Sequence, residues 1–176
     1  KAAYKATQYL IDIGCKRIAH FRGPLLPQNS IDRFLGYKQA LADNNLPYDA
    51  SLVYTLNDMS FEEGKFYANQ LLKDHKDVDG IFINTDLVAI GAIAEFNEQG
   101  IKVPDQINVI GFSNWFMSSV ISPSLTTINQ PGFEMGKKAF KILYKEIKDK
   151  KMNKKTTFKE VVLETDLIVR DSTKQP

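Results

Sequence analysis

Residues 107–136 read INVIGFSNWFMSSVISPSLTTINQPGFEMG, and this segment decides the fold. An apolar run ends abruptly at Ser113, Asn114 and Trp115, where hydrogen-bonding groups and one large ring follow it. A second extended run, Leu125–Asn129, then leads through Pro131 into a helical pattern. In open α/β folds, ligands bind beyond the carboxyl ends of buried strands. The segment therefore predicts a binding site at the edge of a sheet.

Strand and helix patterns alternate upstream of this segment. Short apolar runs predict strands at 17–21, 52–56 and 80–83, before the one at 107–112. Helical patterns lie between them, with candidate N-caps at Asn29 or Ser30, at Ser60 with Glu63 as a capping box, and at Thr85 or Asp86. Such alternation favours a parallel sheet with right-handed crossovers.

Two further helices flank this alternating core. Ala3, Ala6, Leu10 and Ile13 share one face of the first, which has no strand before it, and the second follows Pro131 with an apolar stripe at 136–147. A lone amphipathic helix is poorly stable. We therefore expect both helices to pack on a sheet outside this chain or on a partner chain. Because the sequence begins at Lys1 inside a helical pattern, we also expect it to be part of a longer protein.

Composition restricts the class of protein. The 176 residues are 43% hydrophobic, which can bury a real core, and the net charge of +2 is too small to predict nucleic-acid binding by the chain itself. The single cysteine excludes an intramolecular disulfide. No apolar run approaches the roughly 18 residues of a membrane span, so no membrane partner is expected. Ten lysines between Lys137 and Lys159 are interpreted as a solvated surface.

The strand-end loops bring together the candidate site. Parallel strands would place residues 22–33, 57–59, 85–86 and 113–115 at one edge. Their guanidinium, amide, carboxylate, hydroxyl and indole groups suit a small polar ligand with apolar faces, such as a sugar or nucleoside. Each residue has an alternative role: Arg33 in a surface ion pair, Asp86 as a helix cap, and Met59 or Trp115 in ordinary packing.

Sequence signatures of enzymes are absent. There is no glycine-rich dinucleotide loop, phosphate loop or nucleophile elbow, and neither His20 nor His75 has a partner at metal-ligand spacing. We predict no catalytic residue, no metal and no cofactor. His20 is interpreted as a sheet residue whose hydrogen bonds are satisfied.

The order of several short motifs resembles the LacI/GalR (lactose-repressor) family of bacterial transcription regulators. These are Gly23-Pro24, RFLGY at 33–37, DLVAIG at 86–91, VIGF at 109–112, LTTINQP at 125–131, EMG at 134–136 and LIVRDS at 167–172. The resemblance covers nearly the whole chain. It implies an α/β fold of the periplasmic-binding-protein-like type I, a Rossmann-like parallel sheet flanked by helices, with an effector held in a cleft between two subdomains.

The resemblance also implies a domain organisation. Residues 17–129 and 159–176 would form the C-terminal effector-binding subdomain, and residues 1–16 and 130–158 would be a remnant of the N-terminal one. The DNA-binding head would be absent from this chain. By the resemblance, Arg33 looks like the family arginine that grips the effector, Asn29 and Met59 match further pocket-lining positions, and Gln130 matches a polar residue beside the cleft. Thr85 stands where many members have Asn, just before the matched Asp86. Together with Ser113, Asn114 and Trp115 of the strand-end loop, these are the predicted effector-binding residues. Many members have an acidic residue after the position of Phe112, whereas this chain has Ser113-Asn114.

The function implied by the resemblance is that of a cytoplasmic homodimeric regulator. A small effector, a carbohydrate, would bind in the cleft and change the affinity of the missing helix-turn-helix head for operator DNA. Two alternatives remain open at this point. One is a periplasmic or lipid-anchored sugar-binding protein of a transport system, which shares the fold, and the other is a Rossmann-like enzyme.

Overall fold

The computed structural model describes residues 1–152 and 160–175, which divide into two compact units. The first unit contains residues 1–129 and 166–176, and the second contains residues 130–165. Within the described residues, no helix has the length and apolar character needed to cross a membrane.

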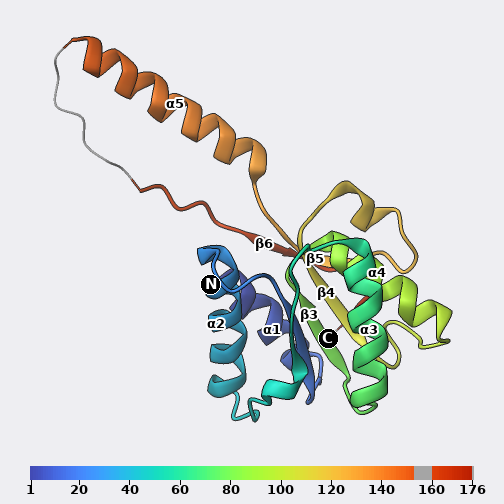
Figure 1. Cartoon of the computed structure of the whole chain (residues 1–176). Helices are drawn as coiled ribbons and strands as arrows, with labels where there is room; N and C mark the ends of the chain where they lie inside the picture. The colour runs from blue at the N-terminus through green and yellow to red at the C-terminus, as the bar shows by residue number, and fades with distance from the viewer. Residues whose placement is uncertain (153–159, 176) are drawn as a thin grey trace. The chain divides into compact units, whose positions relative to one another are not determined.

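A six-stranded sheet forms the centre of the first unit, in the order β2-β1-β3-β4-β5-β6 (Figure 1). The first five strands are parallel and β6 is antiparallel to β5. The predicted α/β fold with a parallel sheet is therefore confirmed. The elements of this unit are α1 (Ala2–Asp12), β1 (Ile18–Arg22), α2 (Gln28–Asp43), η1 (Ala50–Leu52), β2 (Val53–Thr55), α3 (Phe61–Asp74), β3 (Gly80–Ile83), α4 (Asp86–Glu98), β4 (Asn108–Ser113), η2 (Phe116–Ser119), β5 (Thr126–Asn129) and β6 (Asp166–Ile168).

Side chains alternate between two cores along the buried strands. On β3, Phe82 faces the core that includes α1 and α2, whereas Ile81 and Ile83 face the core that includes α3 and α4. The two helix pairs lie on opposite faces of the sheet (Figure 1). This alternation follows from the two-residue period of a strand, and burial on both faces explains the continuous apolar runs in the sequence.

The expected packing of the first helix is wrong. Ala3, Ala6 and Leu10 of α1 are buried against this chain's own sheet and α2, in one cluster with Ile110 and Ile128. The prediction failed because the strands that cover α1 come later in the chain, so no local pattern announces them. Residues 1–16 therefore belong to the sheet unit and not with residues 130–158.

Helix starts were predicted with mixed success. The Ser60 cap of α3 is confirmed, because its hydroxyl accepts from the Glu63 N–H at 3.1 Å. The Glu63 carboxylate differs from the predicted capping box, since it accepts from the N–H groups of residues 57–59 in place of that of Ser60. The predicted caps of α2 are wrong, because Pro27 occupies the N-cap position and the fixed backbone of proline starts the helix.

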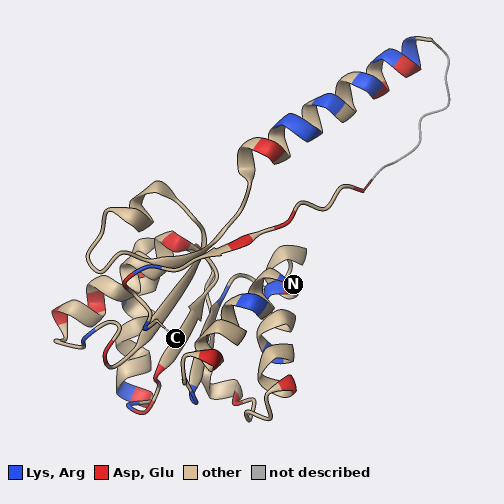
Figure 2. Cartoon of the chain, turned by 180° about the vertical axis from the view of Figure 1, so that it is seen from behind, with Lys and Arg blue, Asp and Glu red and all other residues tan. Residues whose placement is uncertain are grey.

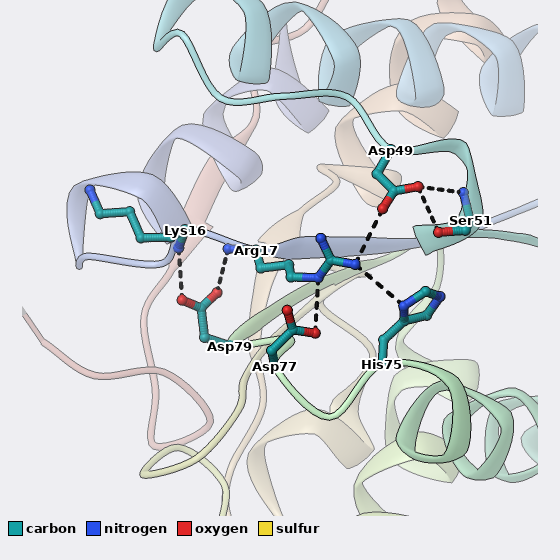
Figure 3. A network of polar contacts seen from close by, with 7 residues as sticks. All are labelled: Lys16, Arg17, Asp49, Ser51, His75, Asp77 and Asp79. Carbon is teal, nitrogen blue, oxygen red and sulfur yellow. Dashed lines mark hydrogen bonds and ion pairs between the residues drawn. The ribbon is translucent and has the colours of Figure 1, made fainter.

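The amino-terminal edge of the sheet is held by a polar network (Figure 3). Arg17 bridges Asp49 at 3.2 Å and Asp77 at 3.0 Å, and it also lies 3.4 Å from Nδ1 of His75. The Asp79 carboxylate accepts from the backbone N–H groups of Lys16 and Arg17. These contacts join the segments that precede β1, β2 and β3. None of them involves the loops at the carboxyl ends of the strands.

The second unit contains α5 (Gly132–Lys151), and none of its residues is buried. Its apolar residues are open to solvent: Phe133 is 81% exposed and Phe140 is 68% exposed. Lysines lie along the helix (Figure 2), which fits their interpretation as a solvated surface. Lys154, Lys155 and Lys159 of the predicted lysine-rich segment lie outside the described residues. In the segment that follows the second unit, Asp166–Ile168 pair with β5.

His20 is a sheet residue, as predicted, and it is fully buried, but it is only partly satisfied, because its Nε2 has no hydrogen-bond partner among the described residues. The buried imidazole is expected to make the stability of the fold dependent on pH. Its Nδ1 donates to the carbonyl of Phe82 at 2.8 Å, and burial lowers its pKa from 6.5 to about 3. The unfolded chain takes up a proton below about pH 6.5, whereas the folded chain resists it. Stability is therefore expected to fall as the pH drops from about 6.5 towards 3, by at most about 1.4 kcal/mol per pH unit from this group.

Urea unfolding at several pH values measures this dependence. His20→Gln should flatten the decline relative to the unsubstituted chain, while His75→Gln serves as the control that retains it. Equal slopes for the unsubstituted chain and His20→Gln would show that His20 is not the responsible group.

Candidate functional site at the carboxyl edge of the sheet

The carboxyl ends of five parallel strands meet at one edge, as the sequence predicted. The register pairs Arg22 with Thr55, Phe82 with Ile110 and Ser113 with Asn129. The loops that leave these strands therefore start side by side. This places the segments around 23–27, 56–59, 84–85 and 114–115 at a single edge.

Arg33 lies in the second turn of α2 and is held firmly at this edge. Its Nη1 donates to the carbonyl oxygen of Asn84 at 2.7 Å, and its guanidinium lies 3.7 Å from the centre of the Phe112 ring. Burial lowers the pKa of Arg33 to about 10, which still leaves it charged at neutral pH. The alternative of a surface ion pair does not describe it, because no carboxylate within residues 1–152 and 160–175 bridges it. A stacked, pre-oriented guanidinium can grip an oxygen-rich ligand.

Asp86 is neither an exposed effector contact nor a helix cap, the two roles that the sequence suggested. The N-cap of α4 is Thr85, so the cap interpretation is wrong. The Asp86 side chain is fully buried and accepts from the N–H of Trp115 at 2.7 Å, the hydroxyl of Ser118 at 2.7 Å and the hydroxyl of Thr127 at 2.6 Å. A direct effector contact by Asp86 is contradicted by this geometry, because the carboxylate has no exposed surface. Its role is to position the loop that follows β4.

The loop at Ser113 and Asn114 has an unusual backbone. Both residues have positive φ angles, 127° and 52°, which non-glycine residues rarely adopt. Asn114 is fastened at three points: its N–H donates to the Thr127 hydroxyl at 3.2 Å, its side-chain amide donates to Asn129 at 3.0 Å, and its side-chain oxygen accepts from Arg170 at 2.7 Å. Strain of this kind is concentrated at functional sites and persists only where surrounding contacts enforce it.

Trp115 and the other predicted contacts differ in their exposure. Trp115 is 43% exposed and meets the Phe116 ring edge to face at 5.2 Å, so the alternative of core packing does not describe it. Asn29 is exposed, and its oxygen accepts from the Ser30 N–H. Met59 is half-buried with a φ of 54° and packs against the core on the α3 and α4 side.

Two predicted residues remain. The Thr85 hydroxyl is buried and has no hydrogen-bond partner among the described residues. Gln130 belongs to the second unit, where it lines a hollow of about 430 Å³ together with residues of α5 and the segment 161–165. The first unit therefore gathers all the predicted site residues except Gln130, with Asp86 beneath the surface.

Three further residues at this edge were not among the predicted effector contacts, although Arg22 lies within the stretch 22–33 assigned to it. Arg22 ends β1 and lies 4.2 Å from the centre of the Phe34 ring, Asn84 supplies the carbonyl that holds Arg33, and Arg170 reaches back to Asn114. A basic residue at the end of an apolar strand was a usable signal for Arg22. No local signal identifies Arg170, because its partner lies 56 residues away. No group of three or more potential metal ligands occurs among the described residues.

Comparison with known proteins assigns the chain to a family. A model of the periplasmic binding protein-like domain matches residues 7–173. Catabolite control protein A of Priestia megaterium is 35% identical over 176 residues, which are 99% of this chain and 51% of that protein. The ribose operon repressor of Halalkalibacterium halodurans is 32% identical over 169 residues, 96% of this chain and 49% of that protein. The chain belongs to the LacI family.

A solved structure supports the same assignment. The transcriptional regulator CelR in complex with cellobiose has a TM-score of 0.89 and 31% identity, and the match covers 97% of this chain and 51% of that one. This LacI-family chain spans about half the length of the relatives it matches. These relatives are named as regulators of transcription and not as enzymes.

Proposed function

We propose that this LacI-family chain is the ligand-sensing domain of a transcription regulator and that it binds a small effector, a sugar, at the carboxyl edge of its sheet. The observation that carries the proposal is the guanidinium of Arg33, stacked on Phe112 and fastened to Asn84. A planar donor held in this way can bind adjacent hydroxyl oxygens, while the exposed ring of Trp115 offers a face for C–H surface. The CelR relative was solved with cellobiose and another relative is a ribose operon repressor, which favours a sugar.

The positioning contacts beneath the loop fit this role. Asp86, Thr127 and Arg170 hold residues 113–115 from below, so that the loop keeps its shape without a ligand. Pre-organisation of this kind reduces the entropy that binding must overcome.

We further propose that residues 130–158 belong to a second subdomain, which closes the cleft. Phe133, Phe140, Tyr144 and Ile147 of α5 are between 48% and 81% exposed, and a contiguous apolar surface of this kind needs a cover. The chain spans about half the length of its relatives. We therefore propose that the apolar face of α5 packs against another part of the full-length protein.

A substitution in α5 tests this cover. Leu143→Ser should change the free energy of unfolding of the 176-residue chain by less than about 0.5 kcal/mol, because Leu143 is 56% exposed there. In the full-length protein the same change should cost about 2–3 kcal/mol, because the side chain would be buried. Chemical denaturation of both forms provides the comparison, with Lys145→Ser as the control. Equal small effects in both forms would reject the cover.

In the proposed mechanism, effector binding favours one arrangement of the two subdomains. In a cytoplasmic homodimer, this arrangement would alter the spacing of two DNA-binding heads and hence the affinity for an operator. The effector must bind the two arrangements unequally, since a ligand with equal affinity for both shifts nothing. A full-length protein that binds the sugar but no DNA would instead support the transport-protein alternative.

Arg33→Ala tests the site directly. We expect the variant to bind the effector about 10-fold to 100-fold more weakly, because a hydrogen bond from a charged group contributes about 1.5–3 kcal/mol. Isothermal titration calorimetry of the full-length protein with a sugar identified by thermal-shift screening measures the loss. Lys38→Ala removes a cation from the same helix and should bind normally. Unchanged affinity in Arg33→Ala would remove this residue from the site.

A further inference from the structure

Two guanidinium groups lie over aromatic rings at the carboxyl edge of the sheet. Arg22 is only 9% exposed and lies 4.2 Å from the centre of the Phe34 ring, and Arg33 covers Phe112 nearby. Burial is the main cause that lowers the pKa of His20, and the positive charges of Arg22 and Arg33 lower it further. Both cations therefore act on the same buried imidazole.

No acidic side chain of the described residues neutralises this pair. Neither arginine forms an ion pair, and the buried Nε of Arg22 has no hydrogen-bond partner within residues 1–152 and 160–175. Three carboxylates of the adjoining segments are engaged elsewhere: Asp32 accepts from Gln28, Glu63 from the backbone of 57–59, and Asp86 from the loop after β4. Asp58, in the loop after β2, is exposed to solvent and forms no ion pair with either arginine. A buried cation without a counter-charge costs free energy, so its persistence calls for an anion.

Further polar atoms without partners lie around the same strand end. The hydroxyls of Ser30 and Thr85, which can donate, and the side-chain oxygen of Asn84, which can only accept, are buried and have no hydrogen-bond partner among the described residues. At Gly23, directly after Arg22, an added Cβ would stand 2.7 Å from the side-chain nitrogen of Asn84 and 3.1 Å from the Ser30 hydroxyl. The absent side chain at Gly23 leaves these groups room. Guanidinium, amide N–H and hydroxyl groups are all donors to an oxyanion.

We propose that Arg22 and Arg33 bind an oxyanion at the end of β1, which is the phosphate or carboxylate group of an acidic small effector. This inference rests on the proposed function and narrows its effector from sugars in general to sugar derivatives that carry a negative charge. The neutral residues Ser113 and Asn114 after β4 fit such a ligand, since an acidic residue at this edge would repel it.

Calorimetry of the 176-residue chain with inorganic phosphate tests the proposal, with sodium chloride used to hold the ionic strength constant. We expect saturable binding of one phosphate per chain. Arg22→Gln should weaken it at least about 10-fold, as expected for the loss of a charge-assisted contact. Lys38→Gln removes the same charge from a neighbouring exposed position and should remain within about 2-fold, because exposed charges are screened. If Arg22→Gln does not fold, Arg22→Lys keeps the charge but loses the planar donor and should bind with intermediate affinity.

Further titrations distinguish a phosphate from a carboxylate ligand. They also distinguish failure of the oxyanion site from failure of the proposed sensing function. A 6-phosphorylated hexose that binds more tightly than the corresponding hexuronate identifies phosphate, and the reverse order identifies carboxylate. The absence of saturable phosphate binding, or equal affinities in Arg22→Gln and Lys38→Gln, would overturn the oxyanion site. If the full-length protein and its Arg22→Gln variant then bound a neutral sugar with equal affinity, the proposed sensing function would stand without the oxyanion site. Failure of every sugar and anion to bind the full-length protein would overturn both.

Discussion

Gly91→Ala is expected to destabilise the first unit by about 3 kcal/mol or more, at or beyond the upper end of ordinary overpacking effects. Gly91 of α4 faces the backbone carbonyl of Phe61, and Gly64 of α3 faces that of Val88 in the reciprocal contact. A methyl group at either glycine would overlap a carbonyl oxygen. Backbone atoms cannot rotate away as a flexible side chain would, so the two helices must separate and expose the core between them.

Urea unfolding followed by circular dichroism measures this effect. Gly136→Ala is the matched control, because Gly136 is also helical but an added Cβ there meets nothing within 4 Å. Alanine normally stabilises a helix interior by up to about 1 kcal/mol relative to glycine, so the control should be neutral or stabilising. Equal stability of the two variants would show that α3 and α4 can adjust their separation freely.

Asp86→Ala is expected to cost about 3–5 kcal/mol, because it removes a buried carboxylate and leaves three donors without an acceptor. The donors are the Trp115 N–H and the hydroxyls of Ser118 and Thr127. Since the strained loop at 113–115 depends on these contacts, its order should be lost together with stability. Trp115 is the only tryptophan of the chain, so its fluorescence reports on the loop specifically.

Two measurements separate the contributions of Asp86. Urea unfolding gives the loss of stability, and a red shift of the Trp115 emission in the folded variant indicates the release of the loop. Asp86→Asn keeps the shape and one acceptor but directs an amide N–H group at the donors, so it should fall between alanine and aspartate. Thr127→Val removes one donor and should cost only about 1 kcal/mol. A loss below about 1 kcal/mol for Asp86→Ala, with unchanged emission, would contradict the positioning role.

Much of the fold was predictable because its signals are local. The start of α3 at Ser60 and Glu63 was predicted from four consecutive residues, and β3 was predicted at its observed bounds from one apolar run. Gly14 and Gly100, both with positive φ, follow the ends of α1 and α4, where a glycine is a local signal for the end of a helix. Parallel pairing then places all strand ends at one edge, which is why Arg33 and Ser113–Trp115 could be assigned to a common site.

The predictions that failed have a common cause: the residues that contact α1, Asn114 or Asp86 lie far from them in the sequence. The cover of α1 comes from β3, β4 and β5, and the support of Asn114 comes from Arg170. Asp86 was interpreted as a cap or a ligand contact, because those are the roles that its own neighbourhood offers. Its observed contacts are to residues 29 to 41 positions later.

The sequence by itself determined the alternation of strands and helices, the common edge of the strand ends and the family, because periodicity, capping residues and short motifs are local properties. Only the tertiary structure decided that Trp115 is exposed, whereas Asp86 is buried beneath the loop at 113–115 and supports it. It also decided that Arg22 is buried without an acidic partner among the described residues. Burial and charge balance depend on all the groups that converge on a point, and these groups come together only when the chain folds.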